Sequence, residues 1–278
     1  MKKTKTISLL TLYALAFTLP VRAALPENDA VFKAMKDEMS RTMKKLRMDS
    51  LQKPYAVSYE IREGRSLDIT ASFGAVESAY SAPYRRLKVD LRIGSPKFDN
   101  TNYAPDRWSG YRPETDWDIS FEGDSYDSLR YSIWAATDKA YKTALETYSK
   151  KKAYKDSTNI TELFDDRTPQ EPRETFLEAG TETLDEELWK ENLRKVSAVF
   201  LKYPDVSYSI ASLSFNSGSA RFLDSEGSAF RKPDCRGRVS IEAETYAPDG
   251  FVLSDGAEEA FCLAKDAPAL TGLLAKAE

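Results

Sequence analysis

The sequence predicts an α+β protein in which antiparallel sheets pack against long helices, and three observations lead to this fold class. Residues 55–73, 87–93 and 206–215 alternate between apolar and polar side chains, as half-buried strands do. Segments with a helical period precede the first and the last of these groups. The order of elements is the same in the two halves of the chain, so we expect two similar helix-plus-sheet lobes.

The N-terminus has the pattern of a secretory signal peptide. Three lysines lie within the first five residues, an apolar run covers 7–19, and Val21 and Ala23 are small residues where signal peptidase requires them. The apolar run is too short to span a bilayer. We therefore expect residues 1–23 to be removed and the protein to be periplasmic or secreted, in a bacterial cell envelope, without membrane contact after cleavage. An uncleaved anchor is the alternative.

The charge of the chain argues against nucleic acid or an anionic membrane as a partner. The 40 basic and 44 acidic residues give a net charge of −4, and removal of residues 1–23, which carry four basic and no acidic residues, lowers it to −8. Basic and acidic residues are evenly mixed along the chain, whereas a nucleic-acid partner requires a concentrated basic patch.

The chain has no histidine and only two cysteines. A Ser-His-Asp triad, a Cys-His dyad and a histidine-bound zinc site are therefore excluded, and we expect no cofactor. Paired carboxylates could still catalyse, so a histidine-free carboxylate hydrolase is one alternative to a protein that only binds. In an oxidising compartment Cys235 and Cys262 are predicted to form a disulfide, with two separate thiols as the alternative.

The first lobe is predicted to cover 24–155. It begins with an amphipathic helix over 28–48, whose methionine-rich face we expect in the core. Two alternating runs on either side of Gly64 predict an antiparallel hairpin, and the run at 87–93 adds a strand. A long helix capped by Asp124 and ending in the basic run at 150–152 completes the lobe.

The second lobe is predicted to cover 184–278, after a polar, proline-bearing linker at 156–183. Thr183 and Glu186 have the spacing of a capping box and predict the start of a helix, which Pro204 ends. Strand patterns follow at 206–215, 220–223 and 239–245. Ser58 and Ser207, each followed by tyrosine, align the two halves as an old duplication would.

Residues 94–123 follow neither period and contain the aromatic residues Tyr103, Trp108, Tyr111 and Trp117. Exposed rings in a long loop suit peptide or sugar binding. The alternative is a flap that folds over the open face of the sheet and buries the same rings. The acids at 116–127 have the spacing of a calcium loop but lack its central glycine, so helix capping and solvation explain them better.

Three segments resemble a known family. They are SYEIREGRSLDITASFGAVESAYSAPYRRLKVDLRIGSPKFDNTNY, SLRYSIWAATDKAYKTALETYSKKKAYK and the turn FLDSEGSAFR. They resemble the N-terminal region of the TldD/PmbA metallopeptidases, also called modulators of DNA gyrase, and are most similar to the secreted bacterial branch. The likeness covers nearly all of the mature chain, with Asp224 where an asparagine is expected.

The resemblance implies an α+β N-terminal domain without catalytic residues. In that family an HExxxH helix and a further ligand hold zinc in a C-terminal domain, near whose expected start this chain ends, and no residue here matches that motif. Family members act as paired subunits that enclose a cavity for unfolded peptides. We therefore expect a secreted, non-catalytic module that associates with a metallopeptidase-type partner or a peptide, as a homo- or hetero-oligomer. An autonomous envelope protein that binds peptide or sugar through 103–117 is the alternative.

Overall fold

The structure, a computed structural model, describes residues 29–103, 116–119, 125–158 and 164–278, with only the backbone of 116–118. Within these ranges four α-helices pack on an eight-stranded sheet, which confirms the predicted α+β class. The helices are α1 (Ala30–Lys45), α2 (Tyr126–Thr158), α3 (Glu186–Ala198) and α4 (Leu270–Ala277). The strands are β1 (Pro54–Ser72), β2 (Ala75–Ser95), β3 (Phe98–Asp99), β4 (Asp116–Asp118), β5 (Glu174–Phe176), β6 (Val206–Asp224), β7 (Ala229–Tyr246) and β8 (Val252–Phe261).

The sheet is built from two long hairpins, β1–β2 and β6–β7, each of which follows a helix. The turn between β1 and β2 is formed by Phe73 and Gly74, both with positive φ, and Gly227 plays the same part between β6 and β7. β1 and β6 lie side by side and antiparallel in the middle of the sheet. The strand order is β3-β2-β1-β6-β7-β5, with β4 paired to β2 and β8 paired to β7.

The predicted hairpin around Gly64 is wrong, because β1 runs straight through this residue. Gly64 pairs with Gly218 of β6. The two backbones approach so closely here that a Cβ atom on Gly64 would lie 2.8 Å from the Cα atom of Gly218. The glycine is therefore required for contact between two strands and not for a reversal of the chain.

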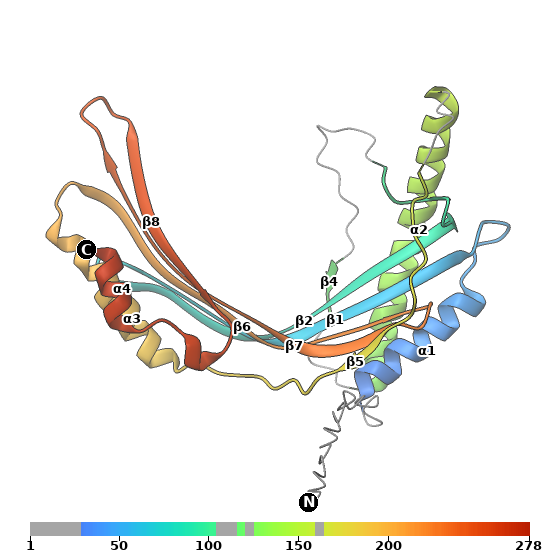
Figure 1. Cartoon of the computed structure of the whole chain (residues 1–278), viewed down its shortest axis with the longest axis horizontal. Coiled ribbons are helices and arrows are strands. Elements are labelled where there is room, and N and C mark those ends of the chain that lie inside the picture. Colours follow the sequence, from blue (N-terminus) through green and yellow to red (C-terminus); the bar gives the residue numbers. More distant parts are fainter. Residues whose placement is uncertain (1–28, 104–115, 120–124, 159–163) are drawn as a thin grey trace, which may run out of the picture.

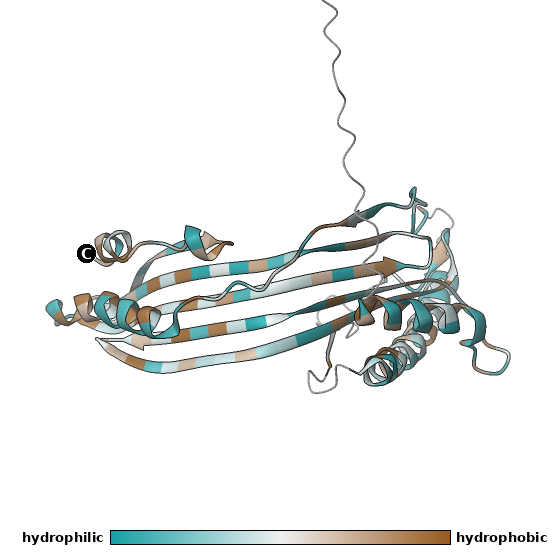
Figure 2. Ribbon diagram, turned by 90° about the horizontal axis from the view of Figure 1, so that it is seen from below, coloured by the Kyte–Doolittle hydropathy of each residue, from teal (hydrophilic) through white to brown (hydrophobic). Residues whose placement is uncertain are grey.

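All four helices pack on one face of the sheet, which we call the outer face. Tyr59 and Ile61 of β1 join a core cluster with α1 and α2, and Leu67 and Ile69 join a second cluster with α3 and α4. These four residues are odd-numbered positions of one strand and share a face. Between the clusters the strands bend, so that the sheet forms a trough with helices along the outside of its two arms (Figures 1 and 2).

The first core cluster explains the methionine-rich face of the first helix. Met35 and Met39 of α1 are buried against the sheet together with Phe32, as expected for core packing. Asp29 begins the helix, since its Oδ1 atom accepts hydrogen bonds from the backbone of Val31 and Phe32 at 3.1 Å. The burial of this apolar stripe on β1 fixes α1 across the sheet.

One predicted helix start is corrected by the structure, and a second is not tested. α3 begins at Glu186, and its cap is Asp185, which accepts a hydrogen bond from the backbone of Leu188, in place of Thr183. Aspartate caps a helix as well as threonine does, and it stands nearer to the first apolar residue. For α2, Asp124 lies outside the described residues, and the Ser125 hydroxyl accepts from the backbone of Ser128 at 3.2 Å.

The segment predicted as a linker makes specific contacts. α2 extends to Thr158, beyond the basic run, and β5 pairs in parallel with β7. Phe176 of β5 is buried, with its ring centre 5.8 Å from that of Phe32. The chain then runs along the outer face to α3 (Figure 1), where the backbone of Glu182 donates to Ser217.

The predicted disulfide is present. It joins Cys235 of β7 to Cys262, just after β8, with 5.2 Å between the Cα atoms. The bond links the end of β8 to the neighbouring strand β7. Among the described residues, no helix is both long enough and apolar enough to span a bilayer.

Candidate functional site

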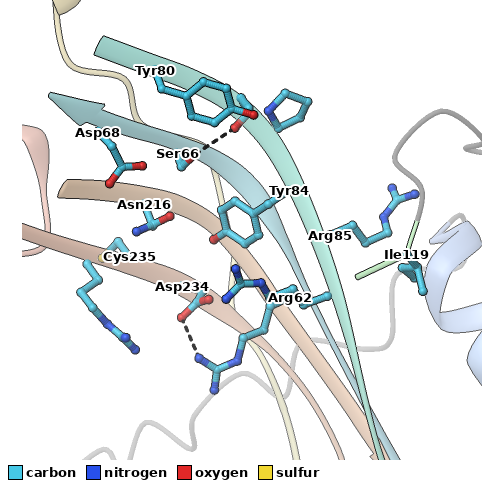
Figure 3. A pocket seen from close by; sticks show the side chains of 14 residues that line it. Arg62, Ser66, Asp68, Tyr80, Tyr84, Arg85, Ile119, Asn216, Asp234 and Cys235 are labelled. Atoms are coloured by element: carbon cyan, nitrogen blue, oxygen red, sulfur yellow. Dashed lines mark hydrogen bonds and ion pairs between the residues drawn. The ribbon is translucent and has the colours of Figure 1, made fainter. Parts of the chain in front are cut away.

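The face of the sheet opposite the helices, which we call the inner face, holds a hollow of about 610 Å³. Even-numbered residues of β1 form part of its floor, among them Arg62, Ser66 and Asp68 (Figure 3). Asn216 of β6 lies beside Ser66, because the two are paired across the strands. We call this hollow the trough site.

Two glycines create the space. Across the four central strands, Tyr84, Gly64, Gly218 and Asp234 are neighbours in one row. The two middle positions have no side chain, so only the side chains of Tyr84 and Asp234, at the two ends of the row, project above the sheet. The same close approach that forces glycine on β1 and β6 thus leaves room for a ligand above them.

Two tyrosines of β2 form one wall of the trough site (Figure 3). Tyr80 is 63% exposed and Tyr84 is half-buried. Burial raises the pKa of Tyr84 above its ordinary value, and Asp234 raises it further, while Arg62 and two neighbouring arginines oppose the shift. The hydroxyl therefore stays neutral at physiological pH, where it can both donate and accept a hydrogen bond.

Three acids around the trough site are engaged by protein groups. Arg62 contacts Glu60 at 2.7 Å and Asp234 at 3.6 Å, and Asp68 accepts a hydrogen bond from the Ser214 hydroxyl at 2.7 Å. All three acids are half-buried. The exposed basic residues of the same face on β2 and β7 are Arg86, Lys88, Lys232, Arg236 and Arg238, and Arg238 pairs with Glu258 of β8.

The predicted aromatic site is only partly described. Tyr103 lies beside Tyr154 of α2, with 5.9 Å between the ring centres, and lines a separate hollow of about 260 Å³ between β2 and α2. Trp108 and Tyr111 lie outside the described residues. Trp117 belongs to β4, and its backbone pairs with that of Leu87 in β2. Binding of a ligand by these four residues stays a prediction.

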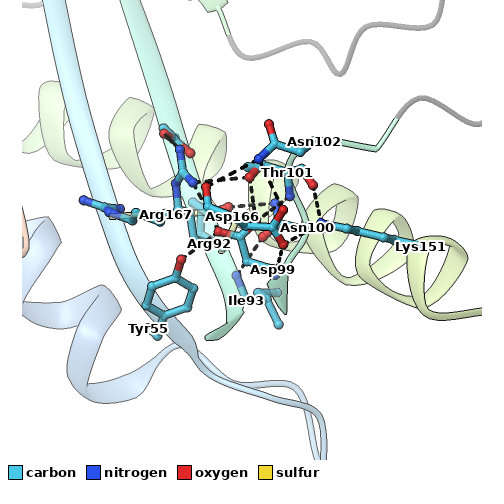
Figure 4. A network of polar contacts seen from close by, with 12 residues as sticks. Tyr55, Arg92, Ile93, Asp99, Asn100, Thr101, Asn102, Lys151, Asp166 and Arg167 are labelled. Atoms are coloured by element: carbon cyan, nitrogen blue, oxygen red, sulfur yellow. Dashed lines mark hydrogen bonds and ion pairs between the residues drawn. The ribbon is translucent and has the colours of Figure 1, made fainter. Parts of the chain in front are cut away.

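A second polar cluster surrounds the buried carboxylate of Asp99 (Figure 4). The Tyr55 hydroxyl donates to it at 2.7 Å, and Thr101 donates from both its backbone and its hydroxyl. Arg92 lies 3.1 Å from the same carboxylate, and Asp166 accepts from the Asp99 backbone at 2.7 Å. These contacts hold the segment after β2 against the sheet edge, so we assign the cluster a structural role.

The two acids that meet in this cluster differ in their surroundings. Burial would raise the pKa of Asp99, but hydrogen bonds from Thr101 and Tyr55 outweigh it and lower this pKa below its ordinary value. Asp166 is held by Lys151 of α2 at 2.5 Å. Each of these side chains has at least one protein partner, although the buried Nε–H group of Arg92 finds no acceptor among the described residues, and the network as a whole holds the segment after β2 in place.

A zinc site does not fit the residues present. The 278 residues include no histidine, and nowhere in the described ranges do three or more acidic or cysteine side chains come close enough to hold a metal ion. The trough site offers hydrogen-bonding groups and aromatic surface.

The trough residues are absent from the predicted site because each was read as part of a solvated strand face. Their proximity depends on pairing between β1 and β6, more than 140 residues apart in the chain. The one local signal is the glycine in a strand that is otherwise regular, with polar residues on both sides.

The fold is α+β, and its inner face carries an open hollow lined mainly by polar side chains. No sequence profile of a protein family and no curated protein sequence matches the chain. Solved structures do match it. A proposed modulator of DNA gyrase from Thermotoga maritima is 11% identical, with a TM-score of 0.47, over 88% of this chain and 46% of its own.

Two further structures match to a similar degree. A proposed modulator of DNA gyrase from Bacteroides thetaiotaomicron is 12% identical, with a TM-score of 0.49, over 84% of this chain and 46% of its own. TldE from Thermococcus kodakarensis is 9% identical, with a TM-score of 0.45, over 90% and 46%. Their names are those of the TldD/PmbA family, and the chain spans about half the length of each.

Proposed function

We propose that this chain is a secreted, non-catalytic module that binds an extended polypeptide in the trough site for a metallopeptidase-type partner. This is the part that the sequence resemblance assigns to the N-terminal domain of TldD/PmbA proteins. The observation that carries the proposal is the 610 Å³ hollow on a helix-free inner face, lined by Tyr80, Tyr84 and polar side chains.

The chemistry of the trough site suits a peptide. An extended peptide offers amide groups and side chains at short intervals, and tyrosine rings provide apolar area together with a hydroxyl that bonds to amides. Ser66 and Asn216 add further hydrogen-bonding groups on the floor. The volume lies within the range of pockets that hold small ligands, which corresponds to a few residues of a peptide.

Secretion is supported by the N-terminal pattern and by the bonded pair Cys235 and Cys262. Structural disulfides persist in oxidising compartments such as the bacterial periplasm and are rare in the cytosol. The partner is proposed because peptide cleavage in the family requires zinc ligands, and these 278 residues include no histidine.

Binding of an unstructured, charge-balanced peptide of about 20 residues, labelled with fluorescein, tests the proposal by fluorescence anisotropy. The double variant Tyr80→Ala/Tyr84→Ala should weaken binding at least about tenfold, because each aromatic contact in a binding site is worth on the order of 1 kcal/mol. Tyr131→Ala is the matched control, since Tyr131 of α2 is 67% exposed and lies on the helical side.

Two results would contradict this proposal. The first is the absence of saturable binding by the unaltered protein. The second is equal binding by the double variant with its thermal unfolding unchanged, which would place the peptide outside the trough site.

A further inference from the structure

β8 forms a free margin of the sheet in the arm that carries α3 and α4 (Figure 1). It pairs with β7 over all ten of its residues, without a bulge, and no strand of the described residues pairs with its other side. Its residues are exposed or half-buried along the whole length. In an antiparallel pair every second residue directs its N–H and C=O groups away from the neighbour, so β8 offers a row of unpaired backbone groups.

Two other stretches of free strand edge contain proline. Pro83 lies in the part of β2 that has β1 as its one neighbour within the described ranges, and Pro233 lies on β7 in the gap between β5 and β8. Because proline has no N–H group, it cannot extend a ladder, and natural sheets use it to prevent the addition of a strand. β8 contains neither proline nor lysine, so its edge lacks these safeguards.

The turn before β8 adds apolar surface. Phe251, Val252 and Leu253 are exposed, Phe251 to 68%, and Tyr246, opposite Val252, is exposed as well. Contiguous apolar residues on a surface mark contact sites for another macromolecule. None of these residues lines the trough site, so this surface is separate from it.

The charge of this part of the chain indicates the chemistry of the partner. Residues 238–278 contain eight acidic and three basic residues, and two of these bases, Arg238 and Lys276, already pair with acids of β8. Glu242 of β7 and Asp255 of β8 are exposed acids. A second copy of the chain would bring like charges together here, whereas lysine or arginine side chains would meet carboxylates.

We propose that the free edge of β8 binds an extended, basic segment of a partner protein as an added strand. The backbone of the segment continues the ladder, its apolar side chains cover Phe251 and Leu253, and its basic side chains lie near the exposed carboxylates. In the unbound protein the Gly256 N–H donates to the Asp255 carboxylate at 2.8 Å, and a carbonyl group of the added strand would replace this acceptor.

Three fluorescein-labelled peptides of ten residues test the proposal by anisotropy. The first alternates valine with lysine, the second alternates valine with glutamate, and the third is the lysine peptide with every backbone nitrogen methylated. The lysine peptide should bind saturably. At low ionic strength the glutamate peptide should bind at least about fivefold more weakly, because like charges repel. The methylated peptide should bind at least about tenfold more weakly, because it cannot form a ladder.

Ser254→Pro places a proline on the β8 edge, as Pro83 and Pro233 stand on others. Ser254 is two residues from Gly256, so its N–H faces the same side. Loss of this donor should weaken binding of the lysine peptide roughly three- to tenfold. Ser254→Ala keeps the N–H and is the matched control, with unchanged binding. Thermal unfolding should agree among the three proteins, and if Ser254→Pro does not fold, the methylated peptide decides.

Four results would overturn the inference. The first is equal binding of the lysine peptide and its methylated form, which would show attraction by charge alone. The second is binding that is lost in Tyr80→Ala/Tyr84→Ala and kept in Ser254→Pro, which would place the peptide in the trough site. The third is a dimer in sedimentation that Ser254→Pro dissociates, which would make a second copy the occupant. The fourth is no saturable binding of the lysine peptide; the charge-balanced peptide tests the proposed function separately.

Discussion

At the scale of single residues, the structure separates groups that hold the fold from groups that are available to a ligand. The Asp99 carboxylate is buried and saturated by Tyr55, Arg92 and Thr101. Tyr80, by contrast, is 63% exposed on the wall of the trough site. Burial and hydrogen-bond partners thus distinguish a structural role from a role in binding.

The Asp99 cluster should make stability depend on acid. The pKa of the Asp99 carboxyl group is lowered in the folded state, so the ionised carboxylate stabilises the fold at neutral pH. This contribution is lost as the pH falls below about 4 toward the folded-state pKa. Asp99→Asn should cost roughly 1–3 kcal/mol at pH 7 and should reduce the difference in unfolding free energy between pH 7 and pH 3. Urea denaturation at both pH values measures this.

Asp138→Asn provides the control for that experiment. Asp138 pairs with Lys142 one turn along α2, on the surface, and should change stability by no more than about 0.5 kcal/mol. An acid-induced loss of stability in Asp99→Asn as large as in the unaltered protein would contradict the role of the buried carboxylate.

At the scale of elements, the long strand β1 is the part that joins the two core clusters. Its outer-face residues pack on α1 and α2 in one half and on α3 and α4 in the other. Gly64 stands between these halves, where β1 meets Gly218 of β6. The floor of the trough site is formed at this contact.

Gly64→Ala should therefore destabilise the protein strongly. The new Cβ atom would overlap with backbone atoms of β6, and relief requires movement of a whole strand, so we expect a loss of roughly 2–4 kcal/mol in unfolding free energy. Gly272→Ala is the matched control: nothing lies within 4 Å of its Cβ position in α4, and alanine should stabilise that helix by up to about 1 kcal/mol. Equal stabilities of the two variants in urea would refute the close approach.

The elements also show which features the sequence could predict. The helical period of Phe32, Met35 and Met39 is local, and it placed α1 and its buried face correctly. Alternation also located the strands. It could not show that β1 continues through Gly64, because a glycine at a turn and a glycine at a strand crossing leave the same pattern in the sequence. Only the register with β6 distinguishes them.

At the scale of the whole molecule, two helix-and-hairpin units share one bent sheet and place their helices on its outer side (Figure 1). The repeated order of helix and strands in the sequence agrees with this order of elements, whereas the division of the chain into two lobes stays a prediction. The trough site could not be predicted, because it combines residues of β2 with residues of β7. These two strands come from different halves of the chain and are brought together by the pairing of β1 with β6. The hollow is thus a property of the assembled sheet.

The most direct test of the account is photocrosslinking from the inner face. Tyr80 is replaced by p-benzoylphenylalanine, which keeps an aromatic ring in the trough site, and Tyr131 of α2 is replaced likewise as the control. On illumination with the labelled unstructured peptide, the account predicts a crosslinked product from position 80 and little from position 131. Equal yields from both positions, or a product from position 131 alone, would contradict peptide binding in the trough.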